Sequence, residues 1–169
     1  ERELPERLEA IRGVHPPDQG WEPARGAYLD ELRTVHEAGR AFLKTRFDAG
    51  ATGREIVRGH AFLTDRLLQH LWRLLAEYLA TERRTGPLSL AAVGGYGRAE
   101  LHPYSDIDLL VLHEDAAETS ATFVEPLLHF LWDMGLPVSH ALRTPDQCVA
   151  DAGDDVTILT TLLEARHLA

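Results

Sequence analysis

Residues 90–112 read LAAVGGYGRAELHPYSDIDLLVL: an apolar run, a glycine-rich turn, a polar loop and a second apolar run. Short apolar runs bounded by glycine and polar residues are typical of buried β-strands. Gly94 and Gly95 permit backbone conformations that other residues resist, and they let the chain approach a ligand closely. The stretch therefore predicts two strands joined by a turn and a loop, and we expect the rest of the chain to position it.

Two carboxylates lie at the start of the second apolar run. Asp106 and Asp108 are two residues apart, so on a strand their side chains point to the same face. Like charges this close repel each other unless a cation lies between them. Hard oxygen ligands favour Mg²⁺, with Mn²⁺ as an alternative, and such ions hold nucleoside triphosphates for displacement at phosphorus. If residues 96–101 form a helix, its N-terminus would offer N–H groups to a phosphate.

Each half of this pattern alone is usually structural. A Gly-Gly pair is most often only a turn, and an Asp-x-Asp is most often a solvated strand end. The combination in one strand–turn–loop–strand context indicates a site. The glycines lack the spacing of a Rossmann fingerprint, and the Gly-Lys-Ser/Thr of a P-loop is absent from the sequence.

Helical patterns precede the first strand. Prolines and glycines separate three expected helices, at residues 3–12, at residues 25–47 and from residue 53 onward. Thr52 and Glu55 have the spacing of a capping box at the start of the third helix. Arg83 and Arg84, followed by Gly86, are expected to end it, because cations and a C′ glycine favour a helix C-terminus.

The pattern changes after residue 87. We expect three strands, at residues 88–93, 107–113 and 138–143. A helix over residues 118–134 separates the last two strands. Thr144 has the N-cap position of a further helix that ends at Gly153, and Asp154 or Asp155 would cap the final one.

Helices therefore come first, and a small sheet with helices packed on it follows, so we predict an α+β fold. We expect residues 1–86 to form an N-terminal helical region packed on the core, and residues 87–169 to form the core. The sequence has no internal repeat and no linker long enough to separate independent domains.

Composition limits the function. The formal net charge of −10 argues against a nucleic-acid-binding surface, which needs clustered cations. No apolar run approaches the length of a membrane span, and no secretory signal is visible. Cys148 is the only cysteine, which excludes an internal disulfide and suits a reducing compartment. The chain starts without Met, as an excised fragment would, and we expect a cytoplasmic protein.

The central stretch resembles a known superfamily. AVGGYGRAELHPYSDIDLL, over residues 92–110, looks like the nucleotidyltransferases of the DNA polymerase β type. With FLWDMGLPVSHALRT at residues 130–144 and Glu-Ala-Arg at residues 164–166, it resembles most closely the transferase domains of the bifunctional PII uridylyltransferase/uridylyl-removing family. The resemblance covers about residues 88–169. The preceding segments resemble the family only in being helical, without matching sequence strings.

The resemblance implies a site and a reaction. Gly94 and Gly95 would contact the triphosphate, Asp106 and Asp108 would bind Mg²⁺, and two further residues would line the phosphate side: Arg98 and Ser105. UMP would pass from UTP, or AMP from ATP, to a tyrosine of the PII signalling protein. Two alternatives stay open: a related transferase with another acceptor, such as glutamine synthetase or a toxin-like target, and a fragment that binds nucleotide without turnover.

Two positions depart from the family pattern. Ala99 replaces a usual glycine, which costs little unless the residue needs a positive φ. Ser139 occupies the position where the superfamily commonly has a third carboxylate, so the general base is unassigned. Asp155 is a candidate for that role, although helix capping is the stronger expectation. Arg143 could reach phosphate or be solvated, and His140 could be an inward structural histidine or a polar contact at the site.

Overall fold

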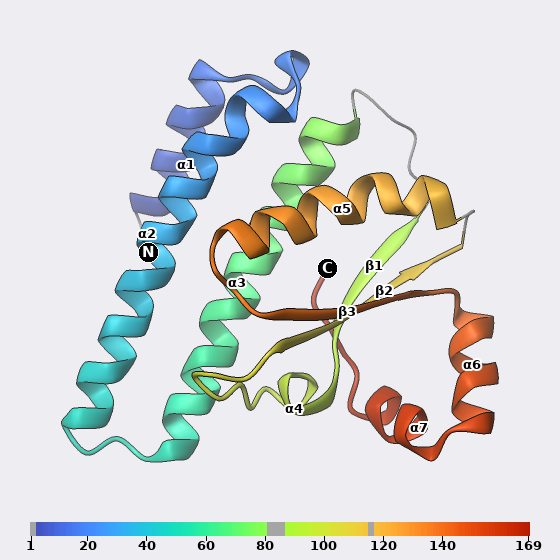
Figure 1. Cartoon of the computed structure of the whole chain (residues 1–169). Helices are drawn as coiled ribbons and strands as arrows, with labels where there is room; N and C mark the ends of the chain where they lie inside the picture. Colours follow the sequence, from blue (N-terminus) through green and yellow to red (C-terminus); the bar gives the residue numbers. More distant parts are fainter. Residues whose placement is uncertain (1–2, 81–86, 115–116) are drawn as a thin grey trace.

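The computed structural model describes residues 3–80, 87–114 and 117–169 (Figure 1). Its elements follow in the order α1 (Glu3–Val14), η1 (Pro17–Gln19), α2 (Trp21–Asp48), α3 (Gly53–Ala80), β1 (Leu88–Ala92), α4 (Gly94–Gly97), β2 (Ile107–His113), α5 (Ala117–Asp133), β3 (Val138–Arg143), α6 (Pro145–Asp154), α7 (Val156–Leu163) and β4 (Arg166–His167). The predicted α+β class is confirmed. Arg83, Arg84 and Gly86, expected to end α3, lie outside the described residues.

The long helices α2 and α3 run antiparallel along one side of the molecule, and α1 packs beside α2 (Figure 1). Trp21, Tyr28 and Tyr78 bury their rings where the helices meet, with centroids between 5.6 and 6.0 Å apart. The second helix begins earlier than predicted because Trp21 joins this cluster and Pro23 is tolerated in a first helical turn. In the part of the chain that the structure describes, no helix has the length and apolar composition of a transmembrane span.

Four strands of the described residues form one sheet in the order β3-β2-β1-β4. β1 is antiparallel to β2 and β4, whereas β2 and β3 are parallel. The predicted bounds of the second and third strands are confirmed. β4 was not predicted, because two residues carry no periodicity and pair only after the chain returns to β1.

The two faces of the sheet bury different side chains. Leu90 and Leu109 lie in the main core, which also contains residues of α3 and α5. Ala91 and Leu110 form a smaller cluster with Cys148 of α6. Asp108 shares the parity of Leu110, so its carboxylate belongs to the face covered by α6 and α7.

The turn after β1 contains one short helix in place of the helix that the sequence left open over residues 96–101. α4 begins at Gly94 and ends at Gly97, and the Gly97 N–H donates to the carbonyl of Val93 over 2.9 Å. The helix cannot continue because Ala99 adopts a left-handed conformation, with φ of 57°.

The predicted capping box at Thr52 and the predicted N-cap at Thr144 are confirmed. The Thr52 N–H donates to a Glu55 carboxylate oxygen over 2.8 Å, and the Glu55 N–H donates to Thr52 Oγ1 over 3.3 Å. Thr144 and Gln147 exchange the same pair of bonds at the start of α6. Hydrogen bonds between residues three positions apart therefore set where these two helices begin.

Candidate active site

The glycine turn and the start of β2 meet at Gly94 and Asp108. Gly94 has a φ of 59°, and a Cβ atom added there would lie 3.3 Å from Asp108 Oδ2. The Val93 N–H donates to the Asp108 carbonyl over 3.1 Å. A side chain at position 94 would therefore be strained and crowded against the carboxylate. The structure brings the two halves of the predicted site into contact.

The two predicted metal ligands have different environments. Asp106 is exposed and lies one residue before β2, while Asp108 is the second residue of the strand and is partly buried. Burial, together with the nearby charge of Asp106, raises the pKa of the Asp108 carboxyl above its usual range. This pair is a concentration of negative charge that a bound cation would relieve.

Ser139 is the β3 neighbour of Asp108. The parallel register of β2 and β3 pairs these two residues directly, so their side chains extend from the same face. Ser139 is exposed. The third-carboxylate position expected from the superfamily is thus adjacent to Asp108 in space, and it carries a hydroxyl.

A network around Arg166 holds the glycine turn in place. Arg166 donates to both carboxylate oxygens of Asp65, over 2.8 and 3.0 Å, and to the carbonyls of Gly97 and Tyr96, over 3.1 and 3.2 Å. The Tyr96 hydroxyl donates to Asp65 over 2.7 Å. Burial and the Asp65 charge raise the pKa of Tyr96, so its hydroxyl keeps its proton and acts as the donor. One ion pair therefore joins α3, the turn and β4.

Gly97 allows the glycine turn to pack closely against the backbone at Glu164. A Cβ atom at that position would lie 2.1 Å from the carbonyl oxygen of Glu164, which is backbone and cannot rotate away. The turn therefore packs directly on the chain that connects α7 to β4. The roles of Asp65 and Arg166 were not predicted from the sequence, because Arg166 appeared only in the Glu-Ala-Arg string of the resemblance and Asp65 belonged to no motif.

Arg98 and Ser105, the residues predicted to contact phosphate, lie near the glycine turn and interact with other residues of the protein. Arg98 Nη1 is 2.6 Å from a Glu164 carboxylate oxygen, and Arg98 Nε is 3.7 Å from Glu100. The Arg98 side chain is nevertheless half exposed, so it can exchange these carboxylates for a phosphate. Ser105 is exposed and precedes Asp106 directly, and its N–H donates to His102.

Arg143 lies at the far end of β3, close to α6. Its Nη1 is 3.2 Å from Asp151 Oδ2. It also lines a cavity of about 300 Å³ between the sheet and α7, together with Val93 and Leu110. Arg143 therefore lies on the same face of the sheet as Asp108, and it forms an ion pair with Asp151 of α6.

Asp155 caps α7, which confirms its predicted capping role. Its Oδ1 accepts hydrogen bonds from the N–H of Thr157, over 2.7 Å, and from the Thr157 hydroxyl. These bonds lower the pKa of the Asp155 carboxyl. His140 is exposed, and its ring lies 6.4 Å from that of Trp132. His140 is therefore neither inward nor at the site.

The residues from α2 to β3 match a known family. Residues 37–141 match the family described as "Putative nucleotidyltransferase DUF294". The chain belongs to this nucleotidyltransferase family. The match includes the glycine turn, both aspartates and Ser139, while Asp155 and Arg166 lie beyond it.

This nucleotidyltransferase domain is also similar to larger bacterial enzymes. It is 39% identical over 172 residues to a bifunctional uridylyltransferase/uridylyl-removing enzyme of Erythrobacter litoralis, covering 99% of the chain and 18% of the relative. It is 37% identical over 171 residues to the enzyme of that name from Azospirillum brasilense, with the same coverage. For Hydrogenovibrio crunogenus the identity is 39% over 147 residues, covering 83% of the chain and 16% of the relative. The chain spans less than a fifth of the length of these curated relatives.

Two carboxylates are the candidates for holding a metal ion in this nucleotidyltransferase, Asp106 and Asp108. Across residues 3–80, 87–114 and 117–169, no group of three or more histidine, cysteine, aspartate or glutamate side chains is placed to hold a metal ion. Asp106 and Asp108 still fit a divalent cation, because burial and the neighbouring charge of Asp106 raise the pKa of Asp108, and a bound cation would favour its ionised form. A bound ion would take its remaining ligands from the nucleotide and water, as Mg²⁺ commonly does.

Proposed function

We propose that this domain transfers a nucleoside monophosphate from a nucleoside triphosphate to a tyrosine hydroxyl of the PII signalling protein and releases pyrophosphate. The observation that carries the proposal is the close approach of the Asp108 carboxylate to Gly94, where an added Cβ would lie 3.3 Å from Oδ2, with Asp106 beside it. UTP is the first donor to test, because the relatives are named uridylyltransferases, and ATP is the alternative.

Each predicted site residue has a role in this proposal. The N–H groups at Gly94 and Gly95, at the start of α4, lack partners within the helix and would donate to the triphosphate. Arg98 and Ser105 would contact phosphate oxygens from the loop, and Arg143 would do so from β3. Asp106 and Asp108 would hold Mg²⁺, or Mn²⁺ in its place. When bound, the ion would neutralise phosphate charge and favour ionisation of the attacking hydroxyl.

The bond changes follow from the reaction class. The tyrosine oxygen forms a bond to the α-phosphorus, the bond from that phosphorus to the bridging oxygen breaks, and its electron pair leaves with pyrophosphate. The hydroxyl proton needs an acceptor. Asp155 is the candidate that the sequence offers, but its carboxylate is engaged with Thr157 and its lowered pKa makes it a weak base.

Ser139 favours a second candidate function, nucleotide binding without turnover. A hydroxyl beside Asp108 supplies neither the charge nor the basicity of a third carboxylate. A transferase with another acceptor, such as glutamine synthetase or a toxin-like target, uses the same site geometry and differs only in what approaches it.

One experiment separates these functions. PII is incubated with the chain, Mg²⁺ and either UTP or ATP, and its intact mass is measured. We expect PII to gain the mass of one uridylyl group with UTP, or of one adenylyl group with ATP, at a tyrosine. Asp106→Asn serves as the control, because it removes a ligand from an exposed position and should leave PII unmodified.

No mass change with either donor would exclude the proposed reaction. Nucleotide binding measured by calorimetry in the same samples would then identify the domain as a binding module. A mass change on glutamine synthetase in place of PII would identify the other acceptor.

A further inference from the structure

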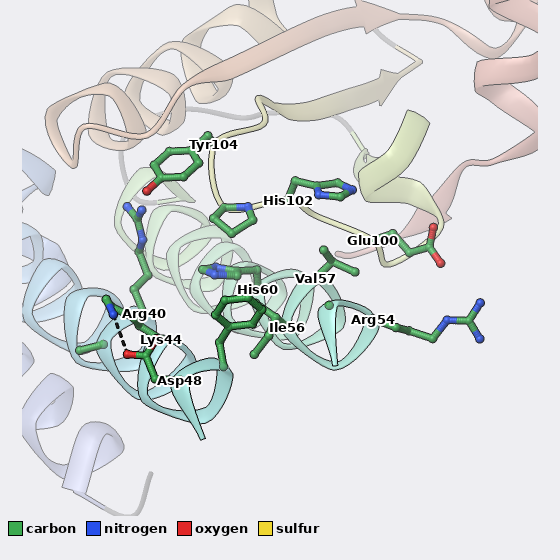
Figure 2. A pocket seen from close by; sticks show the side chains of 14 residues that line it. Arg40, Lys44, Asp48, Arg54, Ile56, Val57, His60, Glu100, His102 and Tyr104 are labelled. Carbon is green, nitrogen blue, oxygen red and sulfur yellow. Dashed lines mark hydrogen bonds and ion pairs between the residues drawn. The ribbon is translucent and has the colours of Figure 1, made fainter. Parts of the chain in front are cut away.

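A large pocket lies on the other side of the loop that leads to Asp106. It has a volume of about 780 Å³ and lies between α2, α3 and the loop around His102 and Tyr104 (Figure 2). We call it the α2–α3 pocket. The Leu101 N–H donates to the Val57 carbonyl over 3.2 Å, which fixes the loop to the pocket floor. The loop that forms one wall therefore ends at the predicted metal ligands.

The charges of the α2–α3 pocket differ from those of the protein as a whole. The chain carries a net charge of −10, yet in this pocket lining Arg40, Lys44 and Arg54 outnumber the carboxylates, which are Asp48 and Glu100. Lys44 is paired with Asp48, with 2.6 Å between Nζ and Oδ2. Within the described residues, no carboxylate lies within ion-pair distance of Arg40 or Arg54. The pocket therefore has two cations available to an anionic ligand.

The rest of the lining is apolar and partly aromatic. Ile56 and Val57 form the floor, and Phe47 and Tyr104 border the pocket, with 56% and 93% of the residue surface exposed. Large exposed aromatic residues next to arginine are typical of surfaces that bind protein. This composition favours a polypeptide ligand with an apolar or aromatic side chain.

The placement of the arginines distinguishes a polypeptide from a nucleotide. Figure 2 shows Arg40 extending toward Tyr104 at one end of the pocket and Arg54 pointing outward at the opposite end. A compact phosphate group needs donors that converge on it, and these two side chains diverge. Separate carboxylates on an extended segment fit this spacing.

We propose that the α2–α3 pocket binds the acceptor protein through an extended segment that carries an apolar or aromatic side chain between acidic residues. This inference rests on the proposed function, because it assumes a protein acceptor. A segment held there would lie beside the loop from His102 to Asp106 and would be close to the transfer site. The pocket would thus select the acceptor while the glycine turn holds the donor.

The test uses charge reversal in the pocket with a matched control. Arg40→Glu and Arg54→Glu place a negative charge in the pocket, whereas Arg58→Glu makes the same change on α3 outside the pocket lining. Tyr104→Ala removes an almost fully exposed ring, so it should not affect folding. For each variant we would measure the Kd for PII without nucleotide, the KM for PII during transfer and the Kd for UTP with Mg²⁺.

We expect Arg40→Glu and Arg54→Glu each to weaken PII binding about tenfold, as charge pairs at interfaces do, with nucleotide binding unchanged. Tyr104→Ala should weaken it as well, and Arg58→Glu should not. If PII is modified with the same KM by all four variants, the pocket is not the acceptor site. If the pocket variants lose UTP affinity, it is a nucleotide site and the inference is wrong.

The two proposals can fail separately. If PII binds the wild type and binding is lost in Arg40→Glu, yet no transfer occurs, this inference stands and the proposed reaction is wrong. If PII neither binds nor is modified, both proposals are wrong.

Discussion

Ser139 of β3 lies directly beside Asp108 of β2 in the parallel register of the sheet. The two strands are separated in the chain by α5, and their pairing puts a hydroxyl next to the more buried of the two site aspartates. In the proposed metal site, two carboxylates would hold the ion, and the neighbouring position 139 could carry a third.

Ser139→Asp should create a stronger metal site. The added carboxylate increases the ligand charge, so we expect about tenfold tighter binding of Mg²⁺ or Mn²⁺, measured by calorimetry. Without metal the Tm should fall because three like charges are close together, and added Mg²⁺ should restore it. Ser139→Asn is the control, since it changes size and polarity without charge. Unchanged metal affinity in Ser139→Asp would mean that position 139 does not face the site.

Asp108→Asn should abolish transfer while raising stability in the absence of metal. The pKa of Asp108 is higher in the folded chain than in the unfolded chain, so the folded state binds this proton more tightly. Ionisation of Asp108 therefore costs stability, and this cost is absent at low pH and develops as pH rises through the raised pKa.

The measurement is the Tm of wild type and Asp108→Asn from about pH 4 to about pH 8. We expect the two curves to meet at the acid end and the variant to be about 2 °C higher at neutral pH. A variant that is less stable at neutral pH, or one that still transfers, would contradict the role assigned to this carboxylate.

Arg166→Ala should destabilise the fold and loosen the glycine turn. It leaves the largely buried carboxylate of Asp65 without its cation and frees two carbonyls of the turn. Allowing for the partial exposure of Arg166, we expect a loss of about 2 kcal/mol in urea unfolding. Lys44→Ala is the comparison, because it breaks an exposed pair and should change stability little. Equal losses in the two variants would argue against a special role for the Arg166 network.

Ala99→Gly should stabilise the protein. Ala99 is the one non-glycine residue of the described chain with a positive φ, at 57°. Glycine removes the steric cost of that conformation, which favours the folded state, but it also increases the entropy of the unfolded chain, which opposes folding. The steric effect is the larger one, so we expect the free energy of unfolding in urea to rise by about 0.5–1 kcal/mol. Ala99→Val is the opposite control, because a β-branched side chain raises the cost. A loss on Ala99→Gly would show that the packing of the Ala99 methyl group outweighs the backbone effect.

Asp155→Asn tests the candidate base. Asparagine is as good an N-cap as aspartate, so this variant should keep the Tm of the wild type, while Asp155→Ala should lower it. Because the carboxylate is engaged with Thr157, we expect Asp155→Asn to retain transfer to PII. Loss of transfer with unchanged Tm and unchanged nucleotide affinity would instead assign Asp155 as the base.

Much of the fold could be predicted because it depends on neighbours in the chain. The strands at residues 107–113 and 138–143, and the helix starts at Thr52 and Thr144, follow from periodicity and from side chains that cap N–H groups three residues away. A helix over residues 96–101, which the sequence left open, does not form: α4 ends at Gly97, and Ala99 has a left-handed conformation.

The residue types of the site were visible in residues 90–112, since two glycines and two nearby aspartates are a local pattern. Their arrangement required the tertiary structure. Asp65 and Arg166 are 101 positions apart and meet only because α3 and β4 pack on the same turn. The α2–α3 pocket likewise exists only where two helices and the loop come together. Local chemistry acts over a few residues, whereas contacts between distant segments depend on which faces the whole core buries.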